Sequence, residues 1–246
     1  MAGFRWCVAD LTEDAIAVAV REGSVDQRDA LGQTRLCFAA RTGSVAAVEE
    51  LCEAGADPNI PRTSSGPGEV DDNSPLLHAA EDGFDTIAGL LLSHGADVHY
   101  RRSRHYNDVD HSDALSAACV RGQWPVVRRV IAAGADANTC GELGGWSALM
   151  VACAASRQPE VELMLSKGAD PTYMSKNDGF GVQEQLTALH AVCSVCPTPG
   201  IVKALLDSGA DANAESLTHR DRTPLHMAGT NRRAVCQPRV PRRDVV

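Results

Sequence analysis

The sequence predicts an all-α protein built from stacked helical repeats, that is, a helical solenoid. Two features of the 246 residues support this prediction. The tripeptide Gly-Ala-Asp recurs along the chain, and an apolar pattern in constant register precedes every copy. A second signature, with small residues near its end, precedes each of those patterns. Self-similarity at a regular spacing is typical of repeat architectures.

The apolar pattern predicts the second helix of each repeat. Counting back seven, four and three residues from each glycine gives a trio that would share one face of a helix. The trios are Val48, Leu51 and Cys52; Ala88, Leu91 and Leu92; Val127, Val130 and Ile131; Val161, Met164 and Leu165; and Val202, Leu205 and Leu206. The glycine itself supplies the left-handed residue that commonly ends a helix. Pro125 and Pro159 stand near two expected helix starts, where a proline costs least.

The other signature predicts a short first helix. Its copies are TRLCFAARTG (34–43), SPLLHAAEDG (74–83), DALSAACVRG (113–122), SALMVACAAS (147–156), TALHAVCSVC (187–196) and the partial TPLHMAG (223–229). Aromatic residues make up 4% of the chain, so Ala, Leu and Val must fill the core. Small residues on one face let neighbouring helices pack closely.

TPLHMAG and the Gly-Ala-Asp segments resemble the ankyrin repeat, whose signature is T-P-L-H-x-A-A followed later by G-A-D-V-N. The resemblance implies an ankyrin-type helical repeat solenoid with hairpin-like connectors, here named fingers. It also implies recognition of a protein partner, through the fingers and the concave face. Since ankyrin arrays carry no chemistry as a class, it implies neither catalysis nor a cofactor.

The sequence departs from the ankyrin signature in most copies. Arg35, Ala114, Ala148 and Ala188 replace the proline, and Cys37, Leu77, Ser116 and Met150 replace the histidine. The Thr–His hydrogen bonding of the family is therefore expected only at Thr187/His190 and Thr223/His226. The other repeats are expected to be held mainly by apolar packing.

The pattern weakens at both ends of the chain. DAIAVAVREG (14–23) resembles the first helix of another unit, but Ser24 to Arg28 are too few for a second helix. Residues 1–28 are therefore expected to form a shortened N-terminal capping unit, which repeat arrays need. Residues 29–229 are the expected ankyrin repeat domain, and 230–246 a basic, disordered tail. Because the last copy lacks a second helix, apolar surface beside Leu205 and Leu206 should be exposed; truncation of a longer chain is the favoured explanation.

Composition narrows the classes of partner and compartment. A formal net charge of -9 argues against nonspecific nucleic-acid binding by the whole protein. There is no apolar run of membrane-spanning length, and the first residues lack the layout of a signal peptide. The nine scattered cysteines favour a reducing compartment. We expect a cytoplasmic protein, with the nucleus as the alternative, that is monomeric unless its C-terminal edge self-associates.

Cys193 and Cys196 form a C-x-x-C pair, three residues after His190. Cys193 shares its place in the signature with Cys119 and Cys153, where a small apolar residue is needed between closely packed helices. Zinc would need four converging ligands, and no second C-x-x-C lies nearby. Packing is thus the favoured interpretation, and a metal or redox site the alternative.

Three fingers are longer than a regular repeat requires: the first finger (58–73), the second finger (98–112) and the fourth finger (171–186). Long insertions on one side of a solenoid commonly mark its binding face, although slack loops cost little. The second and fourth fingers contain Tyr, Met, Phe and Arg, and Tyr, Met and Arg are enriched at binding hot spots. The predicted partner-binding residues are Tyr100, Arg101, Arg102, Arg104, Tyr106, Tyr173, Met174 and Phe180. An alternative is that the arginines pair with Glu69, Asp71 and Asp72 of the first finger.

The sequence contains none of the phosphate-binding, nucleophile-elbow or zinc-protease motifs of common enzymes. The predicted function is therefore that of an adaptor or scaffold. The alternative is a regulatory or substrate-recruiting part of a larger enzyme or ubiquitin-ligase subunit. Asn59, Asn138 and Asn213 match an asparagine that is hydroxylated in some ankyrin repeats, although a turn-forming role is favoured.

Overall fold

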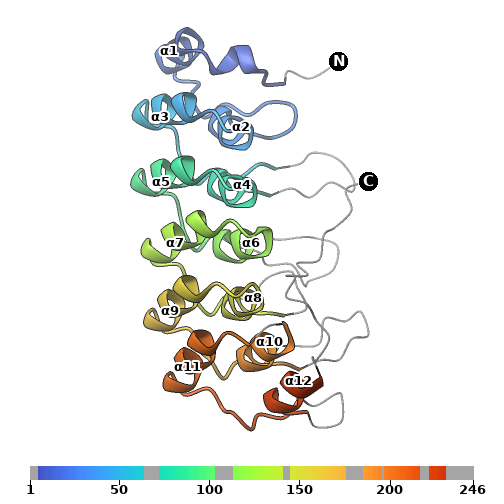
Figure 1. Cartoon of the computed structure of the whole chain (residues 1–246). Coiled ribbons are helices and arrows are strands. Elements are labelled where there is room, and N and C mark those ends of the chain that lie inside the picture. Colours follow the sequence, from blue (N-terminus) through green and yellow to red (C-terminus); the bar gives the residue numbers. More distant parts are fainter. Residues whose placement is uncertain are drawn as a thin grey trace. The chain divides into compact units, whose positions relative to one another are not determined.

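The computed structural model describes residues 5–63, 72–102, 113–140, 145–175, 185–195, 197–216 and 222–230. Every regular element in these ranges is a helix, and the only other pairing there consists of isolated β-bridges (Figure 1). The chain divides into two compact units, residues 1–135 and 136–246. Each unit is a stack of helix pairs, as the sequence predicts.

In the first unit the helices form two columns (Figure 1). The first helices of the repeats are α2 (Arg35–Thr42), α4 (Pro75–Asp82) and α6 (Ala114–Arg121). The second helices are α3 (Val45–Glu53), α5 (Asp85–Ser93) and α7 (Trp124–Ala132). Within this unit each helix packs on its partner in the same repeat, and the equivalent helices of neighbouring repeats pack on each other.

The second unit has the same plan. Its first helices are α8 (Ala148–Ala154), α10 (Ala188–Val195) and α12 (Pro224–Thr230), and its second helices are α9 (Gln158–Ser166) and α11 (Pro199–Asp207). Here α10 packs between α8 and α12, and α9 packs against α11. No second helix follows α12 in the described residues.

Side-chain caps explain where the first helices begin. The side chains of Thr34, Ser74, Asp113 and Ser147 each accept a hydrogen bond from the backbone N–H three residues later. Such a cap satisfies one of the donors that a helix start leaves open, and is worth about 1 kcal/mol. Pro125 and Pro159 lie at the second residue of α7 and α9, as predicted, where neither removes a helical hydrogen bond.

Left-handed residues end the helices. The five glycines of the Gly-Ala-Asp motifs have φ between 82° and 97°, which confirms their predicted role. The first helices of the first unit likewise end at left-handed glycines. Ser156 replaces that glycine after α8 and is the one non-glycine residue with positive φ (56°) in the described chain. The repeat pattern therefore imposes a strained conformation on a serine.

The core follows the predicted periodicity. The leucine at the third place of each of the five full first-helix signatures is at most 3% exposed, as in Leu36, Leu115 and Leu189. The first two residues of each trio are buried, except that Val202 is only partly so. The third is more variable, because it lies at the margin of the apolar face. Leu92 and Leu165 are accordingly only partly buried.

The N-terminal cap differs from the prediction in one respect. Helix α1 (Glu13–Glu22) packs on α3 and so continues the column of second helices, while the short η1 (Val8–Leu11) contacts α2 (Figure 1). The interpretation of residues 14–23 as a first helix is therefore wrong. The sequence did not distinguish the two because first and second helices both end at a glycine. The short connector between α1 and Thr34 is therefore a finger that follows a second helix. Trp6 secures the cap by donating its indole N–H to the carbonyl of Gln33 at 2.8 Å.

The C-terminal edge exposes apolar side chains, as expected, although only one of the two neighbouring leucines, Leu205 and Leu206, is exposed. Leu206 is 42% exposed, whereas Leu205 is fully buried in α11. Leu225 is 79% exposed, although it holds the signature place that is buried in every full repeat. Since α12 has no second helix of its own among the described residues, this leucine has no core to enter. Of the predicted tail, 230–246, Thr230 is the last residue of α12 and 231–246 lie outside the described residues.

Candidate partner-binding fingers

The structure describes the roots of the long fingers and not their tips. Among the predicted partner-binding residues, Tyr100, Arg101, Arg102, Tyr173 and Met174 are described. Arg104, Tyr106 and Phe180 lie outside the described residues. The site can thus be built only from the roots, where each finger leaves and rejoins the helices.

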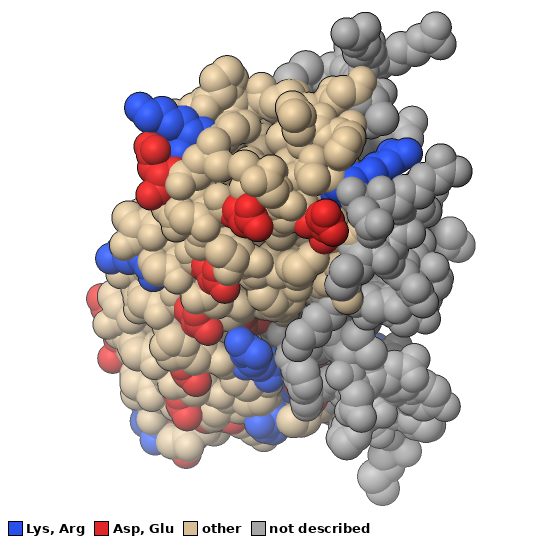
Figure 2. Space-filling model, turned by 90° about the horizontal axis from the view of Figure 1, so that it is seen from below, with Lys and Arg blue, Asp and Glu red and all other residues tan. Residues whose placement is uncertain are grey.

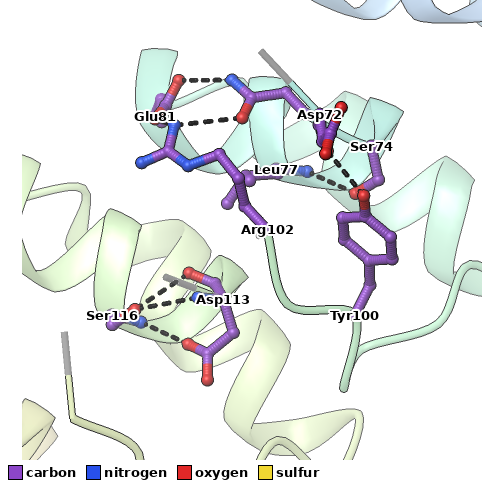
Figure 3. A network of polar contacts seen from close by, with 9 residues as sticks. Asp72, Ser74, Leu77, Glu81, Tyr100, Arg102, Asp113 and Ser116 are labelled. Atoms are coloured by element: carbon purple, nitrogen blue, oxygen red, sulfur yellow. Dashed lines mark hydrogen bonds and ion pairs between the residues drawn. The ribbon is translucent and has the colours of Figure 1, made fainter. Parts of the chain in front are cut away.

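Tyr100 and Tyr173 hold equivalent positions, three residues after the aspartate of a Gly-Ala-Asp motif. Tyr100 donates its hydroxyl hydrogen to the backbone carbonyl of Asp72 at 2.6 Å (Figure 3). Tyr173 does the same to the carbonyl of Gly145 at 2.9 Å. Asp72 and Gly145 each stand two residues before a helix N-cap, so the two bonds are counterparts. Each ties the root of a long finger to the end of the finger before it.

Burial makes these two hydroxyls poor acids. Desolvation is the main reason that the pKa of Tyr100 rises to about 12, with the nearby Asp72 adding to the effect. The pKa of Tyr173 is also raised, first by desolvation and then by its hydrogen bond with Cys140. Both tyrosines therefore remain protonated donors at neutral pH, which their bonds to backbone carbonyls require.

Arg102 is a structural residue in this arrangement. Its side chain is 5% exposed, and its Nη1 donates to Oε1 of Glu81 at 3.1 Å and to Oδ1 of Asn73 at 3.0 Å (Figure 3). A partner cannot reach this guanidinium while the pair is intact, which speaks against a direct partner contact by Arg102. The arginine forms an ion pair with Glu81 of α4. Glu69 and Asp71 of the first finger, named in the alternative interpretation, lie outside the described residues.

Arg101 and Met174 are the described candidates whose side chains remain available. Arg101 is exposed and makes no hydrogen bond or ion pair within the described residues. Met174 is half-buried, next to the anchored Tyr173. The neighbouring arginines of the second finger thus have different roles: Arg102 fixes the root and Arg101 faces solvent.

The described residues carry charges of both signs on one face of the molecule. On the face shown in Figure 2, acidic and basic side chains of the described residues are interspersed among neutral ones. No group of three or more His, Cys, Asp or Glu side chains in the described chain is arranged to hold a metal ion. None of the described helices is both long enough and apolar enough to cross a membrane.

Comparisons with known proteins agree with this geometry. A family model described as "Ankyrin repeats (3 copies)" matches residues 7–102, and one described as "Ankyrin repeat" matches residues 184–217. An ankyrin repeat domain from Acinetobacter baumannii is 32% identical, with a TM-score of 0.63, over 82% of this chain and 97% of its own. This chain belongs to the ankyrin repeat family. Ankyrin repeats are protein–protein interaction modules.

Other relatives show how varied the proteins that contain such repeats are. The human ASB11 ankyrin repeat domain shares the fold at 20% identity, with a TM-score of 0.60 over 92% of this chain and 88% of its own. The B-cell lymphoma 3 protein homolog of Mus musculus is 38% identical over 50% of this chain and 25% of its own length. The probable E3 ubiquitin-protein ligase XBOS32 of Oryza sativa is 35% identical over 47% of this chain and 21% of its own length. The chain thus spans a quarter or less of these two longer relatives.

The ankyrin Thr–His bonds occur where the signature predicts them. His190 Nδ1 lies 2.9 Å from Thr187 Oγ1 and accepts the Thr187 backbone N–H, and Thr223 and His226 repeat this pattern. His190 Nε2 also lies 3.0 Å from the carbonyl of Arg222, in the next repeat. Burial is the main cause of the lowered pKa of His190, so this imidazole is neutral when folded.

The expectation of mainly apolar packing elsewhere proves incomplete. Cys37 stands at the histidine position, and its thiol donates to the carbonyl of Asn73 at 3.5 Å, the counterpart of the His190–Arg222 bond. On the second helices, Arg129 of α7 forms a bidentate ion pair with Asp85 of α5, with N–O distances of 2.7 and 2.6 Å. Polar ties between repeats therefore persist where the signature is lost.

Two of the three asparagines of the Gly-Ala-Asp-x-Asn segments, Asn59 and Asn138, link successive repeats. The side-chain amide of Asn59 donates to the carbonyl of Gly95 at 3.0 Å, and its Oδ1 accepts the Asp97 N–H at 2.7 Å. Asn138 makes the same pair of bonds to Gly168 and Asp170. The asparagine thus bridges to the next repeat, whereas the sequence suggested a bond within its own hairpin.

The cysteines of the first-helix signature are packing residues in the structure. Cys119, Cys153 and Cys193 are all buried, and burial raises the pKa of the Cys153 and Cys193 thiols. Cys153 and Cys193 lie on α8 and α10, which pack together. Cys196 lies outside the described residues, so the structure does not describe the C-x-x-C pair as a whole.

Sequence reasoning missed Asn73, whose backbone carbonyl and side-chain amide form hydrogen bonds at the finger roots. It stands directly before the N-cap Ser74, at a position for which the repeat signature specifies no residue type, and it is 3% exposed. A buried amide needs several hydrogen-bond partners. Those partners come from residues far apart in the sequence, so no local pattern could reveal them.

Proposed function

We propose that this ankyrin repeat chain is an adaptor or scaffold in the cytoplasm that binds a protein partner through its extended fingers and concave face, without catalysis of its own. The observation that carries the proposal is the pair of anchored roots. Tyr100 and Tyr173 fix two long fingers to the preceding repeat, next to available side chains at Arg101 and Met174. A slack loop has no need of such an anchor.

Anchoring favours recognition for a physical reason. Ordering a loop when a partner binds costs free energy, and a loop whose root is already fixed loses less. Arg and Met are residue types enriched at interfaces, and Arg101 is the exposed cation at the root of the second finger. The predicted contacts at Arg104, Tyr106 and Phe180 in the finger tips belong to the same proposal.

The test is a capture experiment from native lysate with matched variants. The partners retained by the unmodified protein are identified by mass spectrometry and compared with those retained by Arg101→Glu and Met174→Asp. Arg21→Glu, an exposed charge reversal on α1 in the first unit, is the control. We expect a partner whose purified form binds the two finger variants about tenfold or more weakly, a loss of at least about 1.4 kcal/mol. Equal retention by all variants would show that the fingers are idle.

A substrate-recruiting part of a ubiquitin ligase is the second candidate. It is favoured by the resemblance to two plant relatives named as E3 ubiquitin-protein ligases, from Oryza sativa and Arabidopsis thaliana. The two candidates differ in the fate of the partner. If the partner is ubiquitinated in cells and Arg101→Glu abolishes this modification, recruitment is supported. A partner that binds but stays unmodified supports the adaptor.

A further inference from the structure

We propose that Asn73 joins the first and second fingers into one recognition element. The proposal rests on the function proposed above, since it concerns the surface that would meet the partner. Its basis is a set of contacts around the buried side chain of Asn73, whose residues are all described. Figure 3 labels two of its partners, Glu81 and Arg102.

Asn73 bonds to four different parts of the first unit. Its backbone carbonyl accepts the Arg62 N–H at 3.0 Å and the thiol of Cys37. Its Oδ1 accepts from Arg102 at 3.0 Å, and its Nδ2 donates to Oε2 of Glu81 at 3.1 Å. The side-chain amide is thus fully oriented, with its oxygen toward the arginine and its nitrogen toward the carboxylate.

These contacts join both ends of the first finger to the root of the second. Arg62 lies near the start of the first finger and Asn73 is its last residue, while Arg102 belongs to the second finger. Glu81 on α4 links these two residues a second time, because its carboxylate accepts hydrogen bonds from both Asn73 and Arg102. The second finger therefore cannot move at its root without breaking bonds that also hold the first.

Burial makes this connection stiff. Asn73 is 3% exposed and the Arg102 side chain 5%, so water cannot readily replace the bonds that a finger movement would break. The Tyr100 hydroxyl adds a further bond between the same two fingers, to the carbonyl of Asp72. Two finger roots joined in this way hold a fixed position relative to each other, which fits a partner that contacts both fingers at once.

The fourth finger has the same backbone closure at its root as the first finger, in which Arg62 donates its N–H to the carbonyl of Asn73. Ser175 donates its backbone N–H to the carbonyl of Leu186 at 2.9 Å, and the Leu186 N–H donates back to the Ser175 hydroxyl at 3.0 Å. The Tyr173 hydroxyl also ties the fourth finger to the finger before it, through the carbonyl of Gly145. Leu186 stands where the first finger has Asn73, however, and has no side-chain amide, so among the long fingers the buried amide belongs to the junction of the first and second.

Amide hydrogen exchange of the free protein tests the coupling directly. The Arg62 N–H is the probe in the first finger, because it is bonded to Asn73, and the perturbation is placed in the second finger. Arg102→Met keeps the apolar stem and removes the guanidinium. We expect the Arg62 amide to exchange about tenfold faster in this variant. Arg101→Met, the neighbouring substitution at an exposed position, should leave that rate unchanged.

The opposite result is equally clear. If Arg102→Met leaves the Arg62 amide at its original rate, the two fingers are independent and the proposal is wrong. Amides of α5 report whether the repeat stays folded. Should they also lose protection, Glu81→Gln replaces the first variant, since it keeps one oxygen that can accept from Asn73 and removes the carboxylate charge that pairs with Arg102. The Arg62 amide must then respond, or the coupling is absent.

The outcome stays separate from that of the proposed function, because hydrogen exchange needs no partner. If the fingers are coupled but no partner is captured, the proposed function is wrong and the coupling still holds. If partners are captured but the fingers exchange independently, the function still holds and the coupling is wrong. If both hold, substitutions at Arg101 and at exposed positions of the first finger should weaken binding non-additively in a double-mutant cycle.

Discussion

At the scale of single residues, a substitution in the repeat signature changes the group that donates a hydrogen bond to the next repeat. The same place in the first helix holds His190 in one repeat and Cys37 in another, and both donate to the carbonyl that precedes the next N-cap. The thiol is a weak donor, so this bond contributes less than the imidazole does. Asn73 and Arg102 supply further bonds at the same junction.

Ser156 offers the simplest test of residue-scale strain. It holds φ at 56°, where an L-residue pays for the approach of its Cβ to the backbone. Ser156→Gly should therefore raise the free energy of unfolding by up to about 1 kcal/mol, because glycine adopts this conformation freely. Urea denaturation followed by circular dichroism measures the change. Gly122→Ser, the reverse substitution at φ 72°, should destabilise by a similar amount; stabilisation by both would contradict the argument.

The cysteines should differ sharply in reactivity. Cys7 is exposed, whereas Cys153 is fully buried and burial raises the pKa of its thiol. Cys52, whose pKa rises to about 11 for the same reason, should also be protected. We expect iodoacetamide at neutral pH to modify Cys7 before Cys52 and Cys153, as mapped by peptide mass spectrometry. In urea the differences in modification rate should vanish. Equal modification rates for Cys7 and Cys153 in the folded protein would show that Cys153 is not protected by burial.

At the scale of elements, a helix is stable when its apolar face meets a neighbour. Leu189 of α10 and Leu225 of α12 hold the same signature place, yet they are 3% and 79% exposed. The difference arises because α10 is followed by α11, while α12 has no second helix among the described residues. The local sequence is similar in both, and only the neighbour differs.

This pair makes a matched prediction. Leu189→Ala should lower the free energy of unfolding by about 2–5 kcal/mol, since it leaves a cavity in a closed core. Leu225→Ala should change it by less than about 0.5 kcal/mol, because the side chain is mostly in water already. Both values come from urea titrations of the two variants. A large loss from Leu225→Ala would mean that this leucine is covered in solution.

At the scale of the whole molecule, stability should depend on pH through His190. The folded-state pKa of this histidine lies below its ordinary value of 6.5, because desolvation disfavours the charged form. Below about pH 6.5 the unfolded chain therefore binds more protons than the folded one. The contribution of His190 to stability is fully present above that pH and is lost as the pH falls through the folded pKa.

Thermal or urea unfolding between pH 5 and pH 8 measures this effect, with the pH range set by the ordinary histidine pKa. We expect the acid side of the stability profile to flatten in His190→Asn, since asparagine does not titrate. That variant loses the bond to Arg222, so its overall stability is lower and only the slopes are compared. An unchanged acid slope would assign the titration to other groups.

The sequence by itself determined the repeat and its register. The apolar trios, the glycines and the signature leucines are local patterns whose spacing forces helices of fixed length with one buried face. Only the tertiary structure decided the roles at the finger roots. Tyr100, Arg102 and Tyr173 suggested partner contacts from residue type, whereas their polar atoms bond to Asp72, Glu81 and Gly145. It also placed α1 in the column of second helices. The physical reason is the same in each case: burial and hydrogen bonding depend on neighbours brought together from distant parts of the chain, which no local spacing records.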